Sequence, residues 1–300
     1  MLDRNNPCLL ERSQGGRGVN ASRPILRYHG GKWLLAPWII QHLAPHHTYV
    51  EPFGGAASVL LRKARSYAEI YNDLDGDVVN LFRVARDQGN ELRQALALTP
   101  FAREEFDASY DETPDPLERA RRMVIRSFMG FGSAAASGER TGFRATSVRT
   151  GTAPSMDWRN YPEALFAITE RLQGVAIENR DAMETMAHHD RPSTLHYVDP
   201  PYVHSTRSTK VRHNATGKSY RHELSDSQHR DLADFLHRLD GMVVLSGYPC
   251  SLYDELYADW HRVERYAHAD GARDRVECLW LNRLAYEGLA QLDIFREPAA

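Results

Sequence analysis

The stretch that decides the fold covers residues 194–202 and reads Thr-Leu-His-Tyr-Val-Asp-Pro-Pro-Tyr. Its first five residues are mostly apolar or β-branched, which is typical of a buried strand. Pro200 and Pro201 fix φ and lack a backbone N–H, so the strand cannot continue beyond Asp199. In an open α/β sheet, ligands bind at the carboxyl ends of the strands. The sequence therefore predicts that Asp199 and Tyr202 lie at a ligand-binding edge.

Short β-branched runs alternate with helical patterns on both sides of this stretch. The pattern predicts strands at 48–53, 68–73, 175–179, 194–199, 242–247, 262–268 and 276–283. It predicts helices at 32–43, 58–64, 77–87, 225–239 and 251–260. Such alternation favours an α/β fold with a mostly parallel sheet of about seven strands. We expect the last two strands to form an antiparallel pair, because only a short polar stretch separates them.

The alternation stops between residues 88 and 172. Helical patterns at 101–109, 116–128 and 161–172 surround a loop at 130–154 that is rich in Gly, Ser, Ala, Arg and Thr. A loop of that length inside a domain is usually functional or disordered. The sequence therefore predicts a mainly helical domain inserted into the α/β domain. The predicted division is a flexible tail at 1–22, an α/β domain at 23–87 and 173–290, an insertion at 88–172 and a tail at 291–300.

The composition is that of a soluble globular protein, with 42% hydrophobic and 26% charged residues. The sequence contains no apolar run long enough to span a membrane. The polar N-terminus lacks the apolar segment of a signal peptide, so we expect a cytoplasmic protein. Cys8, Cys250 and Cys278 are far apart, and the histidines lack the spacing of helical metal ligands. We therefore expect neither a disulfide framework nor a metal site.

The net charge of −3 does not suggest a nucleic-acid partner, but the charge is unevenly distributed. Residues 119–149 contain seven arginines and one acid, and residues 203–222 contain five Lys or Arg and no acid. Two basic patches on an otherwise acidic chain can hold a polyanion at a chosen face. Charge runs are as often solvated surface. On charge alone, both interpretations stay open.

Three further motifs fall where strands are predicted to end or helices to begin. Residues 51–55 read Glu-Pro-Phe-Gly-Gly, and residues 28–32 read Tyr-His-Gly-Gly-Lys. Glycines at such turns let a ligand approach the backbone. Asp73, in Asn-Asp-Leu-Asp, follows the second strand, where α/β nucleotide sites commonly hold ribose hydroxyls. Each motif is weak alone, because glycine turns are common and Asn-Asp clusters often cap helices.

Taken in this order, the motifs resemble the D12-class, Dam-like family of adenine-specific DNA N6-methyltransferases. The resemblance covers residues 25–286 and includes Asp181 in Asn-Arg-Asp as well as Asp-Pro-Pro-Tyr at 199–202. It implies a Rossmann-like sheet that binds S-adenosyl-L-methionine. The cofactor contacts that it implies are Tyr28, Gly30, Gly31, Lys32, Glu51, Pro52, Phe53, Gly54, Gly55, Asp73, Asp181 and Asp199.

The resemblance also implies roles for these residues. Asp73 should bind the ribose of the cofactor, and Asp181 should accept a hydrogen bond from its adenine. Many relatives have Phe after that Asp, whereas this chain has Ala182. The catalytic residues would be Asp199, Pro200, Pro201 and Tyr202. Asp199 and the Pro200 carbonyl would accept from the target amine, and Tyr202 would stack on an adenine flipped out of the duplex.

The expected partner is double-stranded DNA, with residues 88–172 as the target-recognition module. The basic residues that we expect at the DNA are Arg119, Arg122, Arg126, Arg140, Arg144, Arg149, Arg207, Lys210 and Arg212. Either a solitary enzyme or one paired with a separate restriction endonuclease fits this pattern. Three alternatives stay open: N4-cytosine methylation, which more often uses Ser in place of Asp199, an RNA substrate, and an inactive DNA-binding relative.

Overall fold

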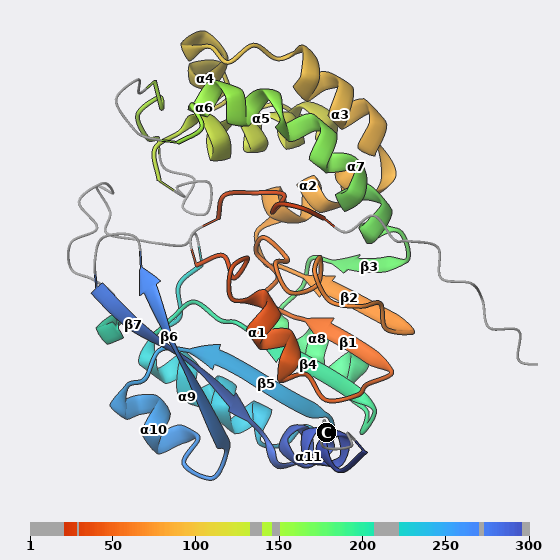
Figure 1. The fold of residues 1–300 in the computed structure, drawn as a ribbon, viewed down its shortest axis with the longest axis vertical. Helices are drawn as coiled ribbons and strands as arrows, with labels where there is room; N and C mark the ends of the chain where they lie inside the picture. Colours follow the sequence, from red (N-terminus) through yellow and green to blue (C-terminus); the bar gives the residue numbers. More distant parts are fainter. Residues whose placement is uncertain are drawn as a thin grey trace, which may run out of the picture.

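The computed structural model describes residues 21–28, 30–132, 140–145, 151–206, 222–269 and 273–295. Its centre is a seven-stranded sheet in the order β3-β2-β1-β4-β5-β7-β6 (Figure 1). The strands are β1 (Thr48–Glu51), β2 (Ala68–Asn72), β3 (Val175–Glu178), β4 (Thr194–Val198), β5 (Met242–Gly247), β6 (His261–Ala269) and β7 (Arg273–Leu281). The first five are parallel, whereas β7 runs antiparallel to β5 and β6 antiparallel to β7. The predicted α/β class and the antiparallel pair are confirmed.

Both faces of the central strands are buried. Successive side chains of a strand point to opposite faces, and each face packs into its own apolar cluster. Leu195 and Val244 belong to one apolar cluster, and Val198 and Leu245 belong to the other. The first cluster includes residues from α1 (Ala36–Gln41) and α11 (Arg283–Phe295). The second includes residues from α8 (Ala182–His189), α9 (Asp226–Leu236) and α10 (Ser251–Leu256). The central strands therefore lie between two helical layers, which leaves their carboxyl ends for ligands.

Several helices start where a side chain satisfies free amides of the first turn. At α9, Ser225 Oγ accepts from the Gln228 amide and Gln228 Oε1 accepts from the Ser225 amide, so the predicted helix start is a complete capping box. Asp75 caps α2 (Gly76–Asp87), and Asp115 caps α5 (Pro116–Met129). Local sequence thus fixes where each of these helices begins.

The segment between α2 and β3 is helical, as predicted. It contains α3 (Gly89–Leu98), α4 (Arg103–Ala108), α5, α6 (Pro154–Arg159) and α7 (Tyr161–Leu172). We call these five helices the helical unit. They gather at one end of the molecule, opposite α11 (Figure 1). The helix α2 packs against α5 and α7, so it joins the helical unit to the sheet.

A buried ionic cluster also ties α7 to the sheet. Arg171 of α7 donates from Nη1 and Nη2 to the two carboxylate oxygens of Glu69 on β2, at 2.6 and 2.9 Å. Lys63 Nζ approaches Glu69 Oε1 at 2.7 Å. A bidentate arginine–carboxylate pair has a fixed geometry. This cluster therefore holds the end of the helical unit in a defined position relative to β2.

The predicted helix at 58–64 is wrong. This segment forms a series of tight turns, and the amide of Leu60 donates to Glu51 Oε2 at 3.0 Å. In a helix that amide would bond to the carbonyl of residue 56. Ala57 has a φ of +50°, which also interrupts right-handed helix geometry. A buried carboxylate thus replaces the helical partner that the apolar pattern suggested.

Several predicted boundaries are also wrong. The helix expected at 32–43 is confined to Ala36–Gln41, where Pro37 occupies the first turn. The helix α11 runs over Arg283–Phe295, although the sequence suggested a strand reaching 283 and a tail from 291. Over the ranges described, no helix combines the length and apolar character needed to cross a membrane.

Candidate active site

Asp199 lies directly after β4, at the carboxyl edge of the sheet, as its sequence position predicts. Ser246 Oγ, on the neighbouring strand β5, donates to Asp199 Oδ1 at 2.6 Å. Lys32 Nζ lies 3.0 Å from Asp199 Oδ2 and also donates to the Gly30 carbonyl at 2.9 Å. Both carboxylate oxygens are therefore oriented before any ligand is present. The Gly-Gly-Lys turn is brought to the same point although it lies far away in sequence.

Tyr202 is held beside this carboxylate by three other side chains. Its ring centroid lies 4.6 Å from Lys32 Nζ and 4.5 Å from the ring centroid of Tyr248, with the two rings nearly perpendicular. Its hydroxyl donates to Glu277 Oε2 on β7 at 3.1 Å. The ring is only 7% exposed. The aromatic side chain of the Asp-Pro-Pro-Tyr motif is thus fixed in position next to Asp199.

Glu51 is the polar centre of the first glycine turn. Its Oε2 accepts from the Tyr49 hydroxyl at 2.8 Å and from the Leu60 amide at 3.0 Å. The side chain is 2% exposed, and this burial raises the pKa of the Glu51 carboxyl to about 8. Asp199 nearby raises the pKa further, while the two hydrogen bonds oppose the shift. Glu51 therefore carries its proton over much of the neutral range.

The two glycines after Phe53 are required by close packing. A Cβ on Gly54 would lie 2.1 Å from the ring of Tyr71. Gly55 has a φ of +47°, a backbone region that favours glycine. Its amide donates to Asp73 Oδ2 at 2.8 Å, and the hydroxyl of Tyr71 donates to its carbonyl at 2.8 Å. The turn after β1 is therefore locked to the end of β2.

Asp73 connects that turn to the start of α2. Its Oδ1 accepts from the Asp75 amide at 2.8 Å, and its Oδ2 accepts from Gly55. Burial raises the pKa of the Asp73 carboxyl to about 6, against the effect of these two hydrogen bonds. Asp181, after β3, caps α8 by accepting from the Met183 and Glu184 amides through Oδ1. Both carboxylates are thus held at successive strand ends.

These strand ends surround a cavity of about 590 Å³. Every residue predicted to contact the cofactor lines it: Tyr28, Gly30, Gly31, Lys32, Glu51, Pro52, Phe53, Gly54, Gly55, Asp73, Asp181 and Asp199. Pro201 and Ala182 also line it. In the part of the chain that the structure describes, Ser58 Oγ is buried, belongs to a residue of the lining and has no hydrogen-bond partner. The structure therefore gathers the predicted cofactor residues around one cavity.

Sequence reasoning missed Ser246, Tyr248 and Glu277. The first two flank the carboxyl end of β5, the strand next to β4, so the strand-end argument applied to Asp199 also covers this position. Glu277 had no comparable signal, because β7 also carries Arg273, Asp274 and Arg275, and because Glu277 touches Tyr202 only through tertiary packing. An acidic residue in a buried strand was the one available indication that it has a specific partner.

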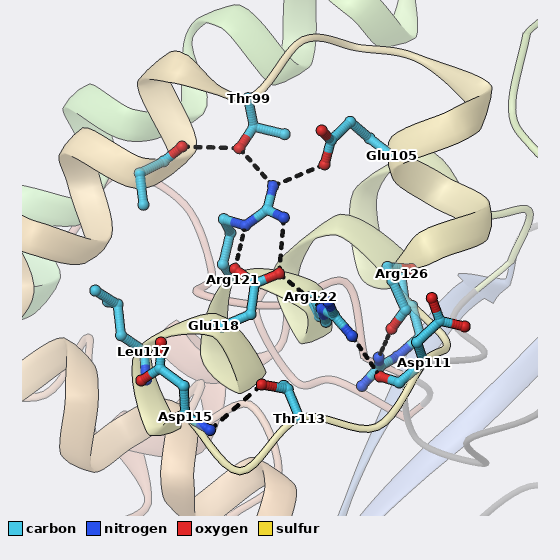
Figure 2. A network of polar contacts seen from close by, with 12 residues as sticks. Thr99, Glu105, Asp111, Thr113, Asp115, Leu117, Glu118, Arg121, Arg122 and Arg126 are labelled. Atoms are coloured by element: carbon cyan, nitrogen blue, oxygen red, sulfur yellow. Dashed lines mark hydrogen bonds and ion pairs between the residues drawn. The ribbon is translucent and has the colours of Figure 1, made fainter.

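Figure 2 shows Arg122 and Arg126 of α5 bound within the helical unit, and Arg119 donates to the Gly76 carbonyl of α2. Arg119 Nε lies 3.2 Å from Asp77 Oδ1, and Arg122 Nε lies 2.6 Å from Glu118 Oε1. Arg126 donates to the Ser109 carbonyl. A phosphate would have to share these guanidinium groups with their internal partners.

Arg121, which the sequence reasoning did not select, is the centre of this network (Figure 2). It donates twice to Glu118, once to Glu105 Oε2 at 2.8 Å and once to Thr99 Oγ1 at 2.8 Å. These contacts link the end of α3, α4 and α5. Several arginines of the helical unit are therefore paired with acidic residues of the same unit.

The arginines after α5 have weaker internal contacts. Arg140 donates to the Asp107 carbonyl at 3.0 Å and lies over the ring of Tyr110 at 4.9 Å. The Arg144 side chain lies 3.5 Å from the Phe128 carbonyl, the limit of a hydrogen bond. The other predicted DNA-binding residues lie outside the described residues: Arg149, Arg207, Lys210 and Arg212.

The sheet order, the Gly turn after β1, the carboxylates after β2 and β3 and the Asp-Pro-Pro-Tyr loop after β4 define a Rossmann-like nucleotide-cofactor protein of the methyltransferase type. The family model of D12 class N6 adenine-specific DNA methyltransferases matches residues 28–270. The chain belongs to this family. The resemblance predicted from its motifs is confirmed.

Curated relatives agree with this assignment. The DNA adenine methylase of Escherichia coli (strain K12) is 28% identical over 194 residues, which are 62% of this chain and 66% of that protein. The DNA adenine methylase of Salmonella typhi is 28% identical over 197 residues, with the same coverage. The match thus spans slightly less than two thirds of the relatives' own length.

Proposed function

We propose that this protein transfers a methyl group from S-adenosylmethionine to N6 of an adenine flipped out of double-stranded DNA. One observation carries the proposal: the oriented Asp199 carboxylate lies at the wall of a 590 Å³ cavity that all the predicted cofactor residues line. Family membership supports a DNA substrate. The cavity wall is where a target amine and a methyl donor would meet.

The chemistry of the cavity fits the proposed cofactor. Its lining contains the carboxylates of Asp73, Asp181 and Asp199 beside the protonated carboxyl of Glu51, with Lys32 among the few cationic groups. S-adenosylmethionine carries a sulfonium and an ammonium group, and it has ribose hydroxyls that donate hydrogen bonds. Acidic side chains match all three. Asp73 would bind the ribose and Asp181 the adenine, and Ser58 Oγ, which has no hydrogen-bond partner in the protein, lies in the same wall.

Asp199 would prepare the attacking nitrogen. The N6 lone pair is conjugated with the purine ring, so the amine is a poor nucleophile. Asp199 accepting one N–H, and the Pro200 carbonyl accepting the other, would favour a pyramidal amine with its lone pair directed at the methyl group. Bound S-adenosylmethionine would supply that methyl group as an electrophilic carbon on its sulfonium. As the N–C bond forms, the C–S bond would break to release S-adenosylhomocysteine, and the nitrogen would lose one proton. Most of the rate enhancement would come from positioning and local electrostatics.

Lys32 must move away from Asp199 when the target amine binds. It lies 3.0 Å from Asp199 Oδ2, the oxygen that Ser246 leaves available. The Gly30 carbonyl, 2.9 Å from Nζ, is already a second partner for the ammonium. Lys32 would therefore orient the carboxylate in the free protein, then move toward Gly30 as the amine binds. Tyr202 would provide the ring on which the adenine stacks.

We further propose that residues 88–172, which include α3–α7, form the target-recognition domain. The helical unit lies beside the carboxyl edge of the sheet and is the largest departure from the α/β pattern (Figure 1). Contacts to bases and to phosphates have different consequences, because only the former carry sequence information. The arginines after α5 suit base contacts better than those on α5, whose partners are internal.

The test is transfer of tritium from methyl-labelled S-adenosylmethionine to unmethylated double-stranded DNA, followed by separation of the nucleosides. We expect the label in N6-methyldeoxyadenosine. Asp199→Asn should abolish it, whereas Asp234→Asn, an exposed change on α9, should leave it unchanged. Label in N4-methylcytosine, label only in RNA, or no transfer by the wild-type protein would each contradict the proposal.

A further inference from the structure

Glu277 is a buried carboxylate that the proposed mechanism does not use. It lies on β7 and is 7% exposed. Burial raises the pKa of Glu277, while Lys32 and the hydroxyls of Tyr202 and Tyr248 oppose the shift. A buried carboxylate is unfavourable unless specific partners satisfy it. The partners of Glu277 are therefore the key to its role.

Two tyrosine hydroxyls converge on this carboxylate. Tyr202 OH donates to Oε2 at 3.1 Å, and Tyr248 is also hydrogen-bonded to the Glu277 side chain. The sheet register explains how three distant residues meet. Gly247 pairs with Cys278 across the antiparallel β5–β7 ladder, so Tyr248 leaves the ladder opposite Glu277. Tyr202 arrives from the neighbouring loop after β4.

The two rings that Glu277 holds are in mutual contact beside Asp199. Their centroids are 4.5 Å apart and their planes meet at 74°. A hydroxyl anchor fixes rotation about the Cα–Cβ and Cβ–ring bonds of each tyrosine, which ring packing alone does less well. Within the described residues, Glu277 is not part of the cavity lining, so it does not reach the cofactor pocket.

We propose that Glu277 is a positioning residue for base stacking: it anchors the hydroxyls of Tyr202 and Tyr248 so that their rings form a fixed surface for the flipped base. The proposal rests on the proposed function, since it assigns a role within adenine methylation. Glu277 acts on the substrate only through the two rings. A misplaced ring lowers the rate of methyl transfer because the amine is then poorly aligned with Asp199.

The test is a mutant cycle measured by single-turnover methyl transfer to unmethylated double-stranded DNA. Glu277→Leu should lower the rate at least tenfold, while affinity for S-adenosylhomocysteine changes less than twofold by calorimetry. Glu277→Gln retains one acceptor oxygen and should recover part of the rate. Glu264→Gln on β6, an exposed charge removal opposite Cys278, is the matched control and should behave as wild type.

The decisive comparison adds Glu277→Leu to the double variant Tyr202→Phe/Tyr248→Phe. With both hydroxyls gone, Glu277 has nothing left to anchor, so the triple variant should be no slower than the double variant. The triple variant also leaves none of these three polar groups unpaired, which protects its folding if Glu277→Leu alone is unstable. A full wild-type rate in Glu277→Leu, or an equal further loss in the triple variant, would overturn the role. A wild-type protein that methylates no DNA contradicts the proposed function instead.

Discussion

The carboxyl edge of the sheet and the helical unit use charge in opposite ways. At the sheet edge, Glu51, Asp73 and Asp199 are held by hydrogen bonds at the wall of a cavity. In the helical unit, Arg121 and Arg122 are satisfied by acids of the same unit. Charged groups held at a cavity indicate a binding site, whereas charged groups that neutralise one another indicate structure. A count of charges along the sequence does not separate these two cases.

The largest expected effect tests the sheet edge. Asp199→Ala should lower the single-turnover rate of methyl transfer at least about 100-fold, the size expected when a group that stabilises the transition state is lost. Affinity for S-adenosylhomocysteine should stay within about threefold, because the lost contact is to the target amine. Retention of more than a tenth of the wild-type rate would remove Asp199 from the chemistry.

The second largest effect is expected at the residues of the same edge that are proposed to contact the cofactor. Asp73→Ala and Asp181→Ala should each weaken S-adenosylhomocysteine binding by about 1–3 kcal/mol, since each removes a hydrogen-bond acceptor from the cavity wall. Asp181→Ala should in addition destabilise the fold by about 1 kcal/mol, because Asp181 caps α8. Unchanged calorimetric affinity in both variants would refute these two contacts.

A third prediction examines the helical unit as a structural network. Arg121→Ala should lower the free energy of unfolding by about 1–2 kcal/mol, because Glu118, Glu105 and Thr99 lose a shared donor. Arg93→Ala, whose 3.7 Å ion pair with Glu163 is largely exposed, should change it by less than about 0.5 kcal/mol. Equal effects in urea titrations would show that the Arg121 network adds nothing beyond a surface ion pair.

The sequence predicted the sheet edge far better than the helical unit, for a physical reason. Strand ends are marked locally: two prolines stop β4 after Asp199, and glycines follow β1. Because parallel strands end at the same edge, residues that mark strand ends in the sequence can be predicted to lie close together in the fold. The contacts of Arg121 with Thr99 and Glu105 depend on how helices pack. The predicted helix at 58–64 was wrong for the same reason: a tertiary contact, in which the amide of Leu60 donates to Glu51, replaces a helical hydrogen bond.

A fourth prediction uses the raised pKa of Glu51. In the folded state this carboxyl holds its proton up to about pH 8, whereas in the unfolded chain it ionises near its usual pKa of 4.5. Between these values the folded state binds the extra proton, so stability falls as the pH rises. One such proton contributes a slope of about 1.4 kcal/mol per pH unit. Glu51→Gln should flatten the stability profile between pH 5 and 7, as measured by urea titration; an unchanged slope would contradict the shift.

The smallest expected effects distinguish the two sets of arginines, and they require the methylated consensus to be known first. Sequencing of DNA from cells that express the protein, with detection of modified bases, provides it. Arg140, Arg144 and Arg149 follow α5, and the first two have few internal contacts. If one of them reads a guanine edge, its alanine variant should relax the consensus at a single position, with a loss of about 1–3 kcal/mol of discrimination.

Arginines that contact only phosphate should behave differently. Their loss weakens binding evenly across sequences and lowers the salt slope by about one unit each. Arg122, tied to Glu118 and the Asp111 carbonyl, should change the slope by less than this, because its charge is already partly neutralised within the fold. A full one-unit change for Arg122→Ala would mean that DNA displaces its internal partners.

If Arg140→Ala, Arg144→Ala and Arg149→Ala all leave the consensus unchanged, the residues that recognise the DNA sequence lie elsewhere in the chain. The second basic stretch, at 203–222, is then the next segment to test, because it is the other part of the sequence in which Lys and Arg are concentrated.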